Sequence, residues 1–139
     1  MSEKLCAVKK HGGGGGSVTE TTLWTNPNPT SAFASQNITL SDNISNYDYI
    51  AINLRIGNAA EYWTNIFPTS EITGYTSSSN TRPLLGARHS NNYYYYRMLQ
   101  YNSDTSLTIG DCVRNTESST ASKLNSGVLP QTIKGIKYA

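Results

Sequence analysis

The sequence predicts an all-β protein, an antiparallel, jelly-roll-like β-sandwich behind a short flexible N-terminal arm. Three observations support this prediction. The 139 residues include 17 Ser, 16 Thr and 14 Asn, and Tyr is the dominant aromatic at 10, a composition that favours strands and polar turns over helices. Short apolar segments recur at intervals of roughly 8–12 residues, separated by turn residues. No segment shows a sustained helical period.

Residues 1–17 are expected to form an arm and a tether. The first eleven residues, MSEKLCAVKKH, precede five glycines, Gly12–Gly16, whose backbone freedom predicts a flexible tether. Four contiguous apolar residues flanked by lysines indicate an arm that docks on its own partner. A solvated terminus and the remnant of an engineered linker are the alternatives. The candidate docking residues are Leu5, Cys6, Ala7, Val8, Lys9 and Lys10.

The body, residues 18–139, is expected to contain eight to ten strands. Its clearest pattern is the alternation of Ile50, Ile52, Leu54 and Ile56 with polar or small residues, which predicts a strand with one face in the core. The other strands expected are 21–25, 36–40, 61–67, 71–75, 84–88, 93–101, 106–109, 112–114 and 128–138. Residues 115–127 are expected to form a long polar loop.

A run of four tyrosines, Tyr93 to Tyr96, lies in one expected strand. Successive side chains of a strand point to opposite faces, so one row is expected to face outward if the other faces the core. We assign the outward face to the row without Met98. An exposed aromatic row predicts contact with a glycan or a neighbouring subunit, whereas a strand buried on both faces is the alternative. The candidate contact residues are Tyr93, Tyr95, Arg97 and Tyr101.

Catalytic and metal-binding motifs are missing from the sequence, so we expect no enzyme activity, no cofactor and no metal. His89 is expected in an ordinary turn. The acids Asp48, Glu61, Glu71, Asp104 and Asp111 allow a carboxylate pair for glycoside cleavage only if the fold brings two of them together. Cys6 and Cys112 are expected to be free thiols of a chain made in a reducing cytoplasm.

Charge and hydropathy exclude further classes. The formal net charge is only +2, and its excess lies at the two ends of the chain rather than along a basic stripe of the kind that binds nucleic acid. No apolar run approaches the length of a membrane span, and no secretory signal is visible. We therefore expect neither a nucleic-acid partner nor membrane insertion.

Several motifs of the body resemble one family. Residues 23–40, LWTNPNPTSAFASQNITL, contain the pattern L-W-x-N-x-x-P-x-x-x-F-x-x-Q, and the segment 47–50 (YDYI) follows. Further motifs are Tyr96-Arg97, Ile109-Gly110-Asp111-Cys112, and Leu129-Pro130 ahead of Ile133-Lys134-Gly135-Ile136-Lys137. Together they resemble small β-rich virion domains of tailed phages and prophages of gut Firmicutes, although Gln131-Thr132 departs from the family's closing pattern. The resemblance covers roughly residues 23–137, and its motifs imply a class of particle rather than a reaction.

The resemblance and the composition together predict a virion structural protein, made in the bacterial host cytoplasm and displayed on the virion surface. The first hypothesis is a surface appendage of the tail, a fibre-tip or receptor-binding domain that contacts host-surface polysaccharide. The alternative is a capsid decoration or head-fibre protein that the N-terminal arm anchors to the shell. A glycan depolymerase is a third and weaker hypothesis. The expected partners are other virion proteins, reached through the arm, and further copies of the chain in a homotrimer.

Overall fold

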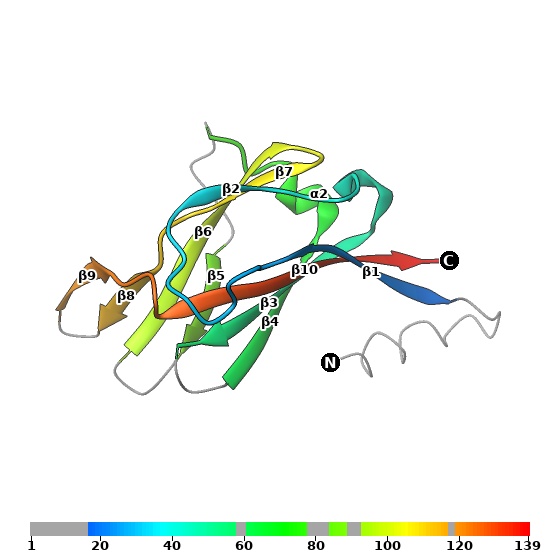
Figure 1. Ribbon diagram of the computed structural model, residues 1–139. Coiled ribbons are helices and arrows are strands. Elements are labelled where there is room, and N and C mark those ends of the chain that lie inside the picture. The colour runs from blue at the N-terminus through cyan, green and yellow to red at the C-terminus, as the bar shows by residue number, and fades with distance from the viewer. Residues whose placement is uncertain (1–16, 58–60, 78–83, 89–92, 117–118) are drawn as a thin grey trace.

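The structure is a computed structural model that describes residues 17–57, 61–77, 84–88, 93–116 and 119–139. Its two antiparallel sheets pack face to face (Figure 1). The all-β sandwich predicted from the sequence is therefore confirmed. The docking-arm residues Leu5 to Lys10 and the turn residue His89 lie outside the described residues. No helix in the described part of the chain is long and apolar enough to cross a membrane.

The first sheet has four strands in the order β1-β10-β3-β4. Their bounds are Val18–Thr25 for β1, Val128–Tyr138 for β10, Tyr49–Ile56 for β3 and Glu61–Pro68 for β4. β10, drawn in orange to red, runs between β1 and β3 (Figure 1). β4 is paired on one side only, so this sheet ends in a free strand edge.

The second sheet has six strands, with β6 (Tyr93–Ser103) at its centre. Its other strands are β2 (Gln36–Thr39), β5 (Leu84–Arg88), β7 (Ser106–Ile109), β8 (Val113–Thr116) and β9 (Ser119–Lys123). β7 and β8 pair with successive halves of β6, separated by the segment 110–112. The pairing register shifts by one residue across that segment, from Leu99 opposite Ile109 to Tyr96 opposite Val113. The segment 110–112 therefore acts as a β-bulge in one long, interrupted strand.

The core lies between the two sheets, and β3 contributes its inward face. Ile50, Ile52, Leu54 and Ile56 are all buried, as their alternation predicts. They pack in one cluster with buried side chains of β6, β7 and β10, among them Leu99, Leu107, Ile109 and Ile133.

Two predicted elements are wrong. Residues 71–75 do not form a strand, because helix α2 (Thr69–Ile72) and a following turn occupy this segment. Thr73 N donates to Thr69 O at 3.2 Å and Tyr75 N to Ile72 O at 3.0 Å, so local bonds satisfy these backbone groups, and only Tyr75 O accepts from a strand, from Tyr101 N of β6 at 2.7 Å, among the bonds of this described segment. The predicted polar loop 115–127 contains β9, whose described side chains are exposed. An edge strand with solvent on its side chains shows no apolar alternation.

Candidate ligand-binding face

The outer face of β6 carries a row of side chains that we call the tyrosine face, formed by the exposed Tyr94 and Met98 and the half-buried Tyr96. The Tyr94 side chain is 42% exposed and that of Met98 46% exposed. The rings of Tyr94 and Tyr96 lie 6.0 Å apart, centroid to centroid, with 37° between their planes. The two rings are thus neighbours on this face, with Tyr94 the more exposed of the two.

The sequence-based assignment of the outward row is wrong. Tyr95 is only 8% exposed, Arg97 is fully buried, and Tyr101 is partly buried against the core. Tyr93 begins β6, but its side chain lies outside the described part. The assignment failed because it placed Met98 inside as the apolar residue and Arg97 outside as the charged one.

Arg97 can be buried because backbone oxygens from four segments surround its guanidinium group. Nε donates to Val128 O at 2.7 Å, Nη1 to Phe33 O and Gly110 O at 2.8 Å each, and Nη2 to Asn125 O at 2.9 Å. Its carbon Cζ also lies 5.3 Å from the Phe33 ring centroid, a cation–π distance. Burial lowers the pKa of Arg97 to about 10, which leaves the group charged at neutral pH. Arg97 therefore ties loops together and is not available to a ligand.

Asp111 completes this network at the bulge. Its Oδ1 accepts from Ser35 N and from Asn125 Nδ2, at 2.9 Å each, and Asn125 Oδ1 accepts from Cys112 N at 2.8 Å. The hydrogen bond from Ser35 N is the main reason why the pKa of Asp111 lies below its ordinary value. The motif Ile109-Gly110-Asp111-Cys112 is thus part of the hydrogen-bond network around Arg97.

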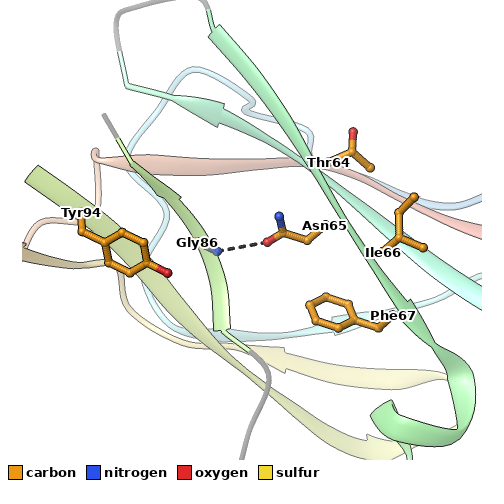
Figure 2. Close-up of a pocket in the computed structure, with 6 residues that line it drawn as sticks. All are labelled: Thr64, Asn65, Ile66, Phe67, Gly86 and Tyr94. Atoms are coloured by element: carbon orange, nitrogen blue, oxygen red, sulfur yellow. Dashed lines mark hydrogen bonds between the residues drawn. The ribbon is translucent and has the colours of Figure 1, made fainter. Parts of the chain in front are cut away.

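A groove of about 450 Å³ borders the tyrosine face, where β4 of one sheet approaches β5 of the other (Figure 2). Asn65 and Phe67 point from β4 towards β5, while Thr64 and Ile66 point away. Asn65 Oδ1 accepts from Gly86 N at 3.0 Å, which links the two sheets. A Cβ at Gly86 would lie 2.6 Å from Tyr94 Oη. Glycine at this position therefore lets the Tyr94 ring lie across β5 beside the groove.

Beyond Met98, the outer face of the six-stranded sheet becomes polar. We call its hydrogen-bonded side chains the polar relay, formed by Gln100, Asn102, Thr108 and Asn37. Gln100 and Thr108 are paired in the β6–β7 ladder, and Asn37 and Thr108 in the β2–β7 ladder. The tyrosine face and the polar relay therefore form one surface along β6. Sequence reasoning missed the relay, because single amides in an Asn-rich chain give no signal of their pairing.

Of the acids considered from the sequence, Asp48 and Asp104, like Asp111, each accept a hydrogen bond that holds the fold together. Asp48 Oδ2 accepts from Tyr138 N at 2.8 Å, and Asp104 Oδ1 accepts from Tyr101 Oη at 2.6 Å. Cys112 is a free, buried thiol, as predicted, and Cys6 lies outside the described residues. Within the described ranges, no group of three or more His, Cys, Asp or Glu residues is placed to hold a metal ion.

Comparisons with known proteins add no relative. No protein-family model matches the chain, and a search of curated proteins finds no significant match.

Proposed function

We propose that this chain is a virion structural protein of a tailed phage, a surface appendage of the tail whose tyrosine face contacts a host-surface glycan. The observation that supports the contact is the pair of exposed Tyr94 and half-buried Tyr96 on the outer face of β6, which continues into the polar relay along the same strand. Aromatic rings with polar tips suit ligands that combine apolar ring faces with hydroxyl groups. The virion assignment draws on the motifs of residues 23–137.

The fold is compatible with an appendage that holds its shape outside the cell. The buried Arg97 joins four segments without a disulfide among the described residues. The loops at this end of the sandwich are thereby fixed by hydrogen bonds that need no oxidising compartment. Residues 1–11 serve in this proposal as the element that docks on other virion proteins.

Counting copies on purified particles tests the virion assignment. Particles from a host that carries the gene are analysed by quantitative mass spectrometry and by immunogold labelling with antibodies against the full chain. A few copies at the tail are expected. Hundreds of copies on the shell would favour the capsid decoration or head-fibre alternative, and absence from particles would overturn the virion assignment.

Binding of the full chain to purified cell-wall polysaccharides of gut Firmicutes tests the contact surface. Tyr94→Ala combined with Tyr96→Ala is expected to weaken binding at least about tenfold, since about 1.4 kcal/mol of lost contact corresponds to that factor. Trp63→Ala is the matched control, because Trp63 is 41% exposed and lies on β4. Equal binding by the double variant and the parent chain would contradict the proposal.

A further inference from the structure

The polar relay is a chain of hydrogen bonds across three strands. Gln100 Nε2 donates to Asn102 Oδ1 at 2.9 Å, and Asn102 Nδ2 donates to Thr108 Oγ1 at 2.8 Å. The Thr108 hydroxyl in turn donates to Asn37 Oδ1 at 2.5 Å. Each hydrogen bond thus fixes the orientation of the next side chain in the relay. The three amides are held in fixed orientations before any ligand arrives.

The relay leaves one unused group at each end. Gln100 Oε1 accepts no hydrogen bond, and Asn37 Nδ2 donates none, within the described part of the chain. Asn37 and Asn102 are exposed, and Gln100 and Thr108 are half-buried. A ligand here therefore meets a fixed acceptor and a fixed donor, and sugar hydroxyls can serve both because a hydroxyl donates and accepts.

The surface is also long, and its relay end is neutral, whereas the ladders place Arg88 of β5 opposite Tyr94 and Lys123 of β9 opposite Val113, beside the tyrosine face. The described outer-face side chains of β6, β7 and β2 named so far are all neutral, and the nearby Lys123 is 3.9 Å from its ion-pair partner Asp111. Eight residues separate Tyr94 from Asn102, a rise of about 26 Å in a strand. That length suits an extended polymer, and the neutral side chains of the polar relay give an anionic polymer no counter-ion at that end of the surface.

We propose that the ligand is a neutral polysaccharide lying along β6, with sugar rings against Tyr94 and Tyr96 and hydroxyl groups on the polar relay. This inference rests on the proposed function and names the substrate class of the same surface. Because the relay is already ordered, binding does not have to immobilise these side chains, which favours affinity.

The test compares two polymers purified from the cell walls of one gut Firmicutes strain, a neutral polysaccharide and the anionic wall teichoic acid. The full chain is expected to bind the neutral polymer with an affinity that changes less than about twofold when salt rises from about 0.05 M to about 0.5 M, since screening acts on charges. Thr108→Val, which breaks the relay at similar size, is expected to weaken binding at least about fivefold. Thr22→Val is the matched control, an exposed threonine of β1 in the other sheet.

The outcomes separate this inference from the proposed function. Tyrosine-dependent binding of teichoic acid with steep salt dependence would overturn the neutral ligand and leave glycan contact standing. Tyrosine-dependent binding that Thr108→Val leaves unchanged would overturn the role of the relay. No binding of either polymer, with a folded chain shown by circular dichroism, would contradict the glycan contact itself. A protein receptor would then be the occupant to seek.

Discussion

Arg97 shows how a single charged residue organises one end of the sandwich. Its donors reach carbonyl oxygens of the loop after β1, the bulge before β8, the turn after β9 and the start of β10. No carboxylate hydrogen-bonds to it among the described residues, so the charge is stabilised by backbone dipoles. A buried charge is tolerated only when such partners are complete.

Replacing Arg97 is therefore expected to destabilise the fold strongly. Arg97→Met keeps an apolar stem but removes the hydrogen bonds to four carbonyl oxygens, of which Asn125 O keeps a second donor, Phe33 N at 3.1 Å, and each unsatisfied group costs about 1–3 kcal/mol. We expect the free energy of unfolding to fall by at least about 3 kcal/mol, measured by urea denaturation. Arg97→Lys is expected to recover only part of this loss, because an ammonium group lacks the planar fork.

The exposed Lys137→Met serves as the surface control for this measurement. Unchanged stability of Arg97→Met would mean that loop packing, rather than the guanidinium group, holds this end together.

At the scale of elements, β3 contributes a row of buried aliphatic side chains to the core, and cutting back one of these side chains has a calculable cost in stability. Ile52 is fully buried opposite Ile133 of β10 and Asn65 of β4. Ile52→Ala is expected to lower the free energy of unfolding by about 2–5 kcal/mol, from lost burial and the cavity left behind. Met98→Ala, at an exposed site, is expected to change it by no more than about 0.5 kcal/mol. Thermal or urea unfolding measures the stability of both variants. Equal losses in their free energy of unfolding would contradict the assignment of Ile52 to the core.

The elements predicted well from the sequence are those whose pattern is set by one buried face. β3 and β7 are of this kind, because their apolar alternation reports burial directly. The prediction failed at α2, where local turn bonds replaced a ladder, and at β9, an edge strand whose one apolar residue is Ala121. These outcomes depend on which strands become neighbours, and pairing across the chain leaves no local pattern.

The candidate site was predictable in part, for a related reason. A run of four tyrosines in a strand places two on each face, and in the structure the outer two are the exposed Tyr94 and the half-buried Tyr96. Which two tyrosines face outward depends on the burial of Arg97, whose four acceptors are carbonyl oxygens of residues 33, 110, 125 and 128. A guanidinium group is expected at the surface unless such a set of carbonyls exists. No property of the sequence near Arg97 reveals that the fold assembles them.

At the scale of the whole molecule, the outer face of the four-stranded sheet has the character of an interface. Tyr62 and Ile66 of β4 are 58% and 37% exposed there. Beside them, Tyr49 and Tyr138 form an edge-to-face pair with centroids 5.7 Å apart. On the same face, Arg55 Nε is buried and has no hydrogen-bond partner. Exposed aromatic and aliphatic side chains around an unsatisfied donor are features that a docking partner would complete.

We propose that this partner is a second copy of the chain and that three copies associate around a common axis through the outer face of β4. Light scattering of the full chain is then expected to give three times the 15.2 kDa mass of one chain. Ile66→Glu places a charge at the contact and is expected to yield monomers, because burying an unpaired carboxylate is unfavourable. Met98→Glu, at an exposed site on the other sheet, is expected to remain trimeric. If the unsubstituted chain stays monomeric at high concentration, self-association is contradicted. If Met98→Glu is monomeric and Ile66→Glu is not, the interface lies on the tyrosine face instead.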